Sequence, residues 1–313
     1  MNLTIACSDN ARTRCLFDGS IGVDGYQIAP SSLPPEDMFR RAFENAEFDV
    51  SELSFSIFLL HVDRGTCPYV GIPVFPSRAF RHAAIYVRSS SGITGLEDLR
   101  GCAIGVRNYL NTAALVVRGL LRDSAGIESG EINWWVGDVD QVERDNIPVP
   151  SLLRRTSIRP APRGHTLSDM LIDGTIDALV HYHPPRGFGT PASPFRRLYA
   201  DSAAAERDYY RSTGIFPIMH LVGLRRTLYD RDPLLALRIY DAFSRAKKAP
   251  ASSSSISNGA GAPPDFEAPE FWPYGVEKNR AAIASLSRYA FEQGLTARPL
   301  AQDDLFVPEL LTT

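Results

Sequence analysis

Short apolar runs of strand length alternate with amphipathic helical patterns along almost the whole chain of 313 residues. Residues 2–8 have the pattern of a first strand, and residues 33–47 follow as a helix with Pro35 in its first turn. The order of strand, helix and strand then recurs up to the last helix. This alternation is typical of an α/β fold with mainly parallel sheets, and the length suits two lobes.

Capping residues and glycines mark several of the predicted boundaries. Thr166 and Asp169 have the spacing of a capping box, and Gly174 ends that helix before a strand at 176–180. Residues 247–269 differ, because their Ser, Ala, Gly and Pro content buries too little apolar area to order itself and predicts a flexible surface loop. The other predictions are a strand that begins at residue 48 and breaks at Ser51, strands at 68–77, 82–89 and 214–226, a helical turn and a strand within 96–110, and helices at 111–126 and 276–294.

Composition excludes several classes of protein. Apolar residues make up 44% of the chain, charged residues 22%, and the net charge is −3, so there is no basic excess of the kind that nucleic acid or an anionic membrane attracts. The N-terminal residues lack the pattern of a secretory signal, and no apolar run is long enough to span a bilayer. We therefore expect a cytoplasmic protein. The chain has four cysteines, Cys7, Cys15, Cys67 and Cys102, and they lack the spacing of a disulfide framework or a zinc site. We expect them to be small buried side chains.

Polar and cationic side chains gather where the predicted strands end, which is where open α/β sheets bind ligands. Arg12 and Arg14 follow the first strand, and two guanidinium groups together suit a dianionic ligand. Ser54 and Ser56 stand near a helix start, where hydroxyls and backbone N–H groups form an anion cradle. The alternatives are two solvated arginines in a loop and two serines that only cap a helix.

A second group of cations crowds the approach to the strand at residues 82–89. Arg78 and Arg81 stand on either side of an aromatic residue, and His82 follows at the mouth of the strand. A soluble protein rarely clusters cations beside apolar strands unless an anion lies between them. We therefore expect an anionic ligand here.

The loop from Arg107 to Thr112, which contains Tyr109, leads into the helix at 111–126. The N-terminus of this helix offers unpaired amides and the positive end of a dipole, so the loop that leads into it is a further candidate for binding an anion. The alternative is that Asn111 or Thr112 caps the helix and does nothing more.

Three histidines follow or end apolar strands. His181 and His183 leave a strand one residue apart, and two imidazoles on one face of a strand are a pattern that some metal sites use. No carboxylate or third histidine is close in sequence, so a metal is only an alternative. His220 ends a strongly apolar run, where a histidine is either a buried core group or a catalyst. The motifs of nucleotide-binding loops, serine hydrolases and zinc proteases are absent from the sequence.

Several of these stretches together resemble one enzyme family. They are residues 73–87, 92–106, 166–180, 209–220 and 271–280, which extend over most of the chain. These residues resemble the 4,5-dihydroxyphthalate decarboxylases. The resemblance implies a type 2 periplasmic-binding-protein-like fold, with two α/β lobes and a ligand cleft between them. Lobe 1 would comprise 1–86 and 217–313, and lobe 2 would comprise 87–216.

The resemblance also implies the reaction. An aromatic dicarboxylate with a catechol, 4,5-dihydroxyphthalate, would lose CO2 without oxidation and give 3,4-dihydroxybenzoate in aromatic catabolism. A ring hydroxyl can supply the electron density, so no cofactor is expected, and the ligand is a small aromatic carboxylate. The proton donor or base would be one of His82, His183 and His220. The implied substrate-binding residues are Arg12, Arg14, Ser54, Ser56, Arg78, Arg81, Arg107, Tyr109, Thr112 and His181.

Three questions stay open at the level of sequence. The same fold would serve a non-catalytic solute-binding protein for an aromatic carboxylate, or a decarboxylase that acts on a related acid. A metal-dependent enzyme that uses His181 and His183 is a further alternative. Assembly into a homo-oligomer is also open, since enzymes of this size often assemble.

Overall fold

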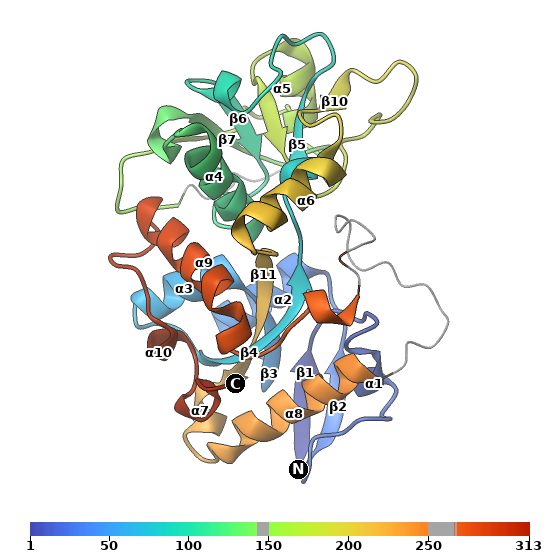
Figure 1. Cartoon of the computed structure of the whole chain (residues 1–313), viewed down its shortest axis with the longest axis vertical. Helices are drawn as coiled ribbons and strands as arrows, with labels where there is room; N and C mark the ends of the chain where they lie inside the picture. The colour runs from blue at the N-terminus through green and yellow to red at the C-terminus, as the bar shows by residue number, and fades with distance from the viewer. Residues whose placement is uncertain (143–149, 250–265, 267) are drawn as a thin grey trace. The chain divides into compact units, whose positions relative to one another are not determined.

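The computed structural model describes residues 1–142, 150–249, 266 and 268–313. Within these residues the chain forms two compact units, and each is described by itself. Unit 1 comprises Met1–Ala79, Phe216–Ser287 and Arg298–Thr313, and unit 2 comprises Phe80–Ile215 and Arg288–Ala297 (Figure 1).

A mixed sheet with the strand order β2-β1-β3-β11-β4 forms the centre of unit 1. Strand β1 is parallel to β2 and β3, whereas β11 is antiparallel to both β3 and β4. The carboxyl ends of β1, β3 and β4 therefore lie at the same edge as the amino end of β11. The strands are β1 (Asn2–Ala6), β2 (Gln27–Ser31), β3 (Val50–Ser54), β4 (Tyr69–Arg78) and β11 (Ile218–Arg225).

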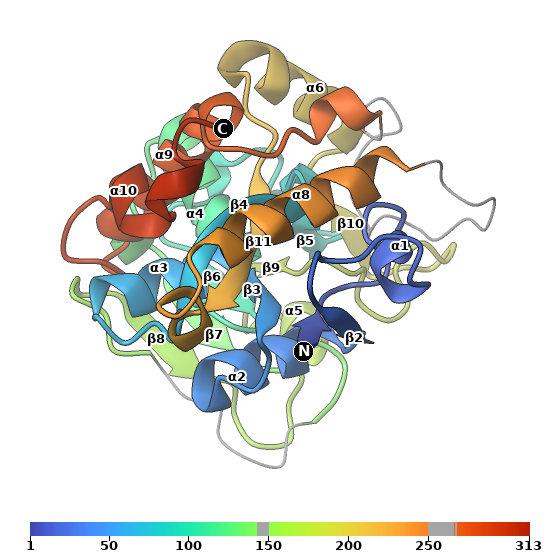
Figure 2. The same ribbon diagram turned by 90° about the horizontal axis from the view of Figure 1, so that it is seen from below.

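Helix α2 of unit 1 follows the sequence pattern closely. In α2, Pro35 occupies the first helical position, and Met38 and Phe39 on one stripe are buried, as the sequence predicts. Helix α8 packs against β4 and α1 (Figures 1 and 2). The helices are α1 (Arg14–Phe17), α2 (Pro35–Asn45), α3 (Phe55–Asp63), α7 (Arg226–Tyr229), α8 (Leu234–Lys248) and α10 (Gln302–Leu305), with 3₁₀ turns at Pro269–Phe271, Glu277–Asn279 and Pro308–Leu310.

Unit 2 has its own mixed sheet, with the strand order β10-β5-β9-β6-β7-β8. Strands β6, β7, β8 and β9 run parallel, and β5 is antiparallel to β9 and β10. The carboxyl ends of β6 and β9 thus share an edge with the amino end of β5. The strands are β5 (Ile85–Arg88), β6 (Ala103–Val106), β7 (Asn133–Val136), β8 (Ser157–Pro160), β9 (Ala178–Val180) and β10 (Phe195–Arg197).

The predicted caps of unit 2 are confirmed. Asn111 is the N-cap of α4, and its side chain accepts a hydrogen bond from the amide of Ala114 at 2.7 Å. Thr166 and Asp169 form the capping box of α5, which Gly174 ends with a φ of 88°. The helices are α4 (Thr112–Ala125), α5 (Leu167–Asp173) and α6 (Ser202–Thr213), with 3₁₀ turns at His82–Ala84, Glu97–Leu99 and Ser129–Glu131.

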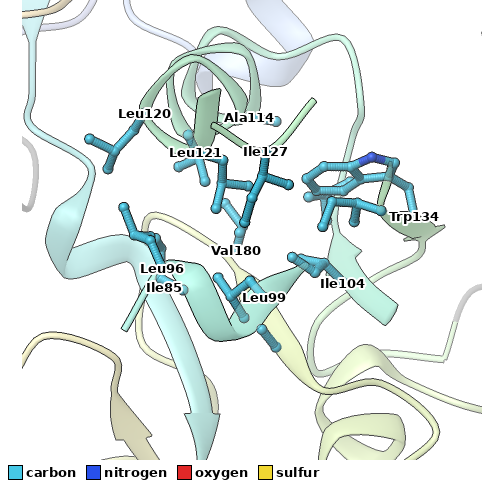
Figure 3. Close-up of a cluster of buried hydrophobic side chains, with 14 of the residues drawn as sticks. Ile85, Leu96, Leu99, Ile104, Ala114, Leu120, Leu121, Ile127, Trp134 and Val180 are labelled. Atoms are coloured by element: carbon cyan, nitrogen blue, oxygen red, sulfur yellow. The ribbon is translucent and has the colours of Figure 1, made fainter. Parts of the chain in front are cut away.

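Apolar side chains cover both faces of the unit 2 sheet, as is usual for sheets of mainly parallel strands. Along β5, Ile85 faces one cluster and Tyr86 faces the other, because successive side chains of a strand alternate between faces. The larger cluster packs strand side chains beneath α4 (Figure 3). Trp134 in this cluster is almost completely buried, and its indole N–H donates to the carbonyl of Ser129 at 2.9 Å.

The boundaries between units differ from the expectation. The expected division after residue 86 falls inside β5, which pairs with β9 and β10 and so belongs wholly to unit 2. Helix α9 (Arg280–Glu292) is divided between the two units after Ser287, and its residue Tyr289 donates to Asp123 of unit 2 at 2.7 Å. The residues from 288 to 297 therefore join unit 2.

Two local predictions are wrong. The strand beginning near residue 48 does not break at Ser51, which pairs with Ala6 and Gly223 inside β3. The predicted loop at 247–269 starts too early, because Lys247 and Lys248 form the last turn of α8. At its other end Phe266 is buried against Phe216. Residues 250–265 and 267 lie outside the described residues. No described helix combines the length and the apolar character needed to cross a membrane.

Candidate active site

Several of the predicted residues of unit 1 meet at one edge of its sheet. Arg12 lies in the loop after β1, Ser54 ends β3, Arg78 ends β4, and His220 lies near the start of β11. The strand directions described above bring these four positions to the same edge. Residues that are far apart in the sequence therefore form a single group, as the strand-end argument predicts.

His220 and Glu52 form a hydrogen-bonded pair at this edge. In the register of β11 and β3, His220 lies opposite Ser54 and diagonally across from Glu52. The Nδ1–H of His220 donates to Oε1 of Glu52 at 2.5 Å, and the amide of Ser8 donates to Oε2 at 2.7 Å. The carboxylate thus fixes the tautomer and the orientation of the ring.

Burial and hydrogen bonding shift the pKa of Glu52 in opposite directions. Burial raises the pKa of this carboxyl group, but the hydrogen bond and charge of His220 and the contacts with Ser8 outweigh burial, so the pKa of Glu52 is lowered overall. Glu52 is therefore an anion at neutral pH. His220 keeps 18% of its side chain exposed, and Phe39 packs against its ring edge-on at 4.8 Å between centroids. An acid–base group in this setting has a fixed charge partner and access to a ligand.

The two arginines after β1 have different surroundings. Arg12 is buried, donates to the carbonyl of Pro76 at 3.1 Å, and stacks 3.6 Å from the ring centroid of Trp272. Arg14 instead donates to Asp9 at 2.7 Å and keeps about a third of its side chain exposed. The two guanidinium groups therefore have different partners, and their joint role as a clamp stays a prediction.

Arg78 braces the polypeptide at the end of β4. Its guanidinium group donates to the carbonyls of Phe216 and Pro273, each at 2.9 Å, and to the side chain of Asn279. The same Asn279 donates to the carbonyl of Gly275 at 2.7 Å. Arg78 therefore holds residues 273–279 against β4. Its role as a carboxylate clamp stays a prediction.

The two serines near α3 are buried, and their hydroxyl oxygens lie 3.3 Å apart. Ser54 occupies the N-cap position of α3, but its side chain makes no capping hydrogen bond. Simple capping by the Ser54 side chain is therefore not what the structure shows. Ser54 is the residue that pairs with His220 in the register of β3 and β11.

Unit 2 gathers its predicted residues at the equivalent edge of its own sheet. Arg107 follows β6 directly and forms an ion pair with Asp138, which follows β7. Thr112 is buried at the first position of α4. Tyr109 lies in the hydrophobic cluster, where its hydroxyl hydrogen-bonds Ser129 at 2.5 Å. The ring of Tyr109 is therefore part of the core, and its role in substrate binding stays a prediction.

The approach to β5 is more buried than the sequence suggests. His82 packs edge-on against Tyr199 and Tyr209, at 5.2 and 5.4 Å between centroids, and burial lowers the pKa of His82 to about 4. Burial likewise lowers the pKa of Arg81 to about 10, against the opposing effects of Tyr182 and Glu206. His82 is therefore a neutral ring at pH 7 and a weak proton donor there.

The two histidines after β9 are not on a strand. Strand β9 ends at Val180, and the Nδ1–H of His181 donates to the backbone carbonyl of His183 at 2.9 Å. Their rings lie 6.0 Å apart and tilted by 67°, so the expected one-face arrangement is wrong. Across the described residues, no three or more His, Cys, Asp or Glu side chains are grouped so that they could hold a metal ion.

Comparisons with known proteins decide the family. No family model matches the chain. A 4,5-dihydroxyphthalate decarboxylase of Comamonas testosteroni is 33% identical over 325 aligned residues, which cover 99% of this chain and 98% of the relative. The chain belongs to the 4,5-dihydroxyphthalate decarboxylase family. A second member, from Pseudomonas putida, is 37% identical over 212 residues and covers 68% of this chain and 82% of the relative.

Solved structures identify the fold of this decarboxylase family member. The periplasmic aliphatic sulphonate binding protein SsuA of Escherichia coli aligns over 98% of this chain and 92% of its own, with a TM-score of 0.56 and 14% identity. The desulfurization enzyme DSZB aligns over 99% of this chain and 97% of its own, with a TM-score of 0.53 and 15% identity. The fold is therefore periplasmic-binding-protein-like, as the resemblance implies.

Two site residues of this family member were missed by sequence reasoning. Glu52 was overlooked because the strand was expected to break at Ser51, and a carboxylate in a turn would be solvated. A continuous β3 instead places Glu52 on the same face as Ser54, since alternate residues share a face. Trp272 has no local signal, because only the folded chain brings it to Arg12.

The cysteines behave as predicted where they are buried. All four are free, and Cys7 and Cys67 are buried whereas Cys15 and Cys102 are partly exposed. Burial raises the pKa of Cys7 well above its usual value, and the negative charges of Glu52 and Asp9 raise it further. Cys7 therefore stays a thiol beside the candidate site at neutral pH, and a thiol is a poor nucleophile.

Proposed function

We propose that this protein converts 4,5-dihydroxyphthalate to 3,4-dihydroxybenzoate (protocatechuate) and CO2, in the catabolism of phthalate. Membership of the family supports this substrate, because the alignment with the Comamonas testosteroni enzyme covers nearly all of both chains. The observation that carries the proposal is the Glu52–His220 pair, which places an acid–base group at the strand edge where Arg12 and Arg78 also lie.

The proposed step exchanges a carboxylate for a proton at one ring carbon. The hydroxyl para to the leaving carboxylate supplies electron density to that carbon, which takes a proton from Nε2–H of a doubly protonated His220. The bond between the ring and the carboxylate then breaks, its electron pair restores the aromatic ring, and CO2 leaves. His220 regains its proton from water, so the net reaction consumes one proton. The Glu52 carboxylate compensates the charge of the protonated ring throughout.

No electron-sink cofactor is needed in this scheme, because the ring hydroxyl fills that role. Arg12, Ser54 and Ser56 are the proposed ligand-orienting groups of unit 1. Arg81, Arg107, Thr112 and His181 of unit 2 stay predicted substrate-binding residues, and His82 and His183 stay alternative acid–base candidates.

The proposed compartment is the cytoplasm. Four free cysteines support it, because thiols persist in a reducing environment.

Purified protein treated with a chelator should convert 4,5-dihydroxyphthalate to equal amounts of CO2 and 3,4-dihydroxybenzoate. Thermal stabilisation by the compound without product would contradict the proposal and favour a solute-binding protein, a role that the likeness to a sulphonate binding protein makes the natural competitor. Turnover that returns only after a divalent metal is added would favour the metal-dependent alternative at His181 and His183.

A further inference from the structure

Three cations of unit 1 converge on three consecutive residues. The guanidinium group of Arg12 stacks on the ring of Trp272 at 3.6 Å from its centroid. Arg78 donates to the carbonyl of Pro273 at 2.9 Å. The third cation is an ammonium group, that of Lys247 at the end of α8, and it lies 4.4 Å from the ring centroid of Tyr274.

Lys247 is held in place but not neutralised. Its Nζ donates to the carbonyl of Trp272 at 2.7 Å, and among the described residues it has no carboxylate partner. Burial and, to a smaller extent, the nearby charges of Arg78, Lys248, Lys278 and Arg12 together lower the pKa of Lys247 to about 8. The ammonium group thus stands in a field of like charge, which a bound anion would relieve.

Tyr274 adds an unused hydrogen-bond donor to this group. The residue is only 6% exposed, and its hydroxyl is buried without a hydrogen-bond partner in the part of the chain that the structure describes. Burial raises its pKa strongly, so the phenol stays protonated and can donate. A buried polar group without a partner is costly, and in native proteins it calls for an explanation such as a ligand.

We propose that Lys247 and the hydroxyl of Tyr274 form a subsite that binds the carboxylate retained by the substrate. The inference rests on the proposed function and names the part of the substrate that this subsite holds. Both groups are donors at neutral pH, which suits a carboxylate rather than a neutral catechol hydroxyl. The leaving carboxylate should not be the one that binds here, because an ion pair with it would stabilise the ground state and oppose its loss.

Two substitutions test the subsite, with phthalate as a probe that has both carboxylates but no hydroxyl groups and gives no decarboxylation signal. Lys247→Met should weaken phthalate binding by about 10- to 100-fold and raise KM for 4,5-dihydroxyphthalate by a similar factor, with little change in kcat. Tyr274→Phe removes one oxygen and should weaken binding by about 2- to 10-fold. Lys248→Met is the matched control, since it removes the same charge from the exposed neighbour on α8, and it should leave both quantities within about twofold.

The results separate this inference from the proposed function. Loss of phthalate binding in Lys247→Met, measured calorimetrically on a protein with an unchanged circular dichroism spectrum, supports the subsite even if the wild-type protein releases no CO2. Phthalate binding equal to that of the wild type in both Lys247→Met and Tyr274→Phe would overturn it, even if the wild-type protein is an active decarboxylase. A wild-type protein that does not bind phthalate, or a Lys247→Met variant in which only kcat falls, would overturn it as well.

Discussion

Replacing His220 with Asn should lower kcat for 4,5-dihydroxyphthalate by about 100- to 10,000-fold, the range that a positioned general acid contributes. Asn can still donate a hydrogen bond to Glu52, so the local structure should persist, but it cannot deliver a proton to the ring carbon. Steady-state kinetics would show the loss in kcat, while phthalate binding should stay close to that of the wild type.

Two further variants make this prediction specific. Glu52→Gln keeps the shape of the buried side chain but removes the charge that faces His220. Its kcat should therefore fall clearly below that of the wild type, but less than in His220→Asn. His165→Asn removes an exposed histidine and should leave kcat unchanged. If His220→Asn stays within about threefold of wild type while His82→Asn or His183→Asn is inactive, the proton donor has been assigned to the wrong residue.

Replacing Arg78 with Met should lower the free energy of unfolding by about 3–5 kcal/mol, because two buried acceptors lose their donor and a third, part-buried acceptor keeps only its bond from the side-chain amide of Asn279. These acceptors are the carbonyls of Phe216 and Pro273 and the side-chain oxygen of Asn279. Met retains the apolar stem of the side chain, so most of the loss should come from the missing hydrogen bonds. Urea unfolding followed by circular dichroism measures the difference.

Arg14→Met is the control for this experiment. Arg14 pairs with Asp9 while a third of its side chain is exposed, and such pairs contribute about 0–1 kcal/mol. Equal stabilities of Arg78→Met and Arg14→Met would show that Arg78 does not brace residues 273–279. A destabilised Arg78→Met variant should also lose activity, because Tyr274 lies in the segment that Arg78 holds.

Local signals in the sequence predicted much of the secondary structure. Asn111, the Thr166–Asp169 capping box and Gly174 act through hydrogen bonds and φ angles within a few residues, so their effect can be inferred without the fold. The strand-end rule also holds for Arg12, Ser54 and Arg78, because β1, β3 and β4 run in the same direction. His220 shares their edge for a different reason, since β11 is antiparallel and His220 lies near its amino end.

The features that could not be predicted from the sequence depend on contacts between residues that are far apart in the chain. Glu52 and His220 meet across 168 residues because β11 inserts between β3 and β4, a register that no local pattern specifies. Tyr109 looked like a ligand residue in a polar loop, but it is buried once α4 covers the sheet. Lys247 was assigned to a loop on composition, although α8 extends to Lys248.

The most direct test of the central claim is the reaction in D2O, followed by NMR of the product and by CO2 release. We predict one CO2 for each molecule of 3,4-dihydroxybenzoate, with deuterium at the ring carbon that carried the lost carboxylate and a rate proportional to the amount of protein. His220→Asn should abolish this signal. Unchanged 4,5-dihydroxyphthalate after prolonged incubation with folded wild-type protein that still binds it would contradict the account, and the chain would then be a binder of aromatic carboxylates.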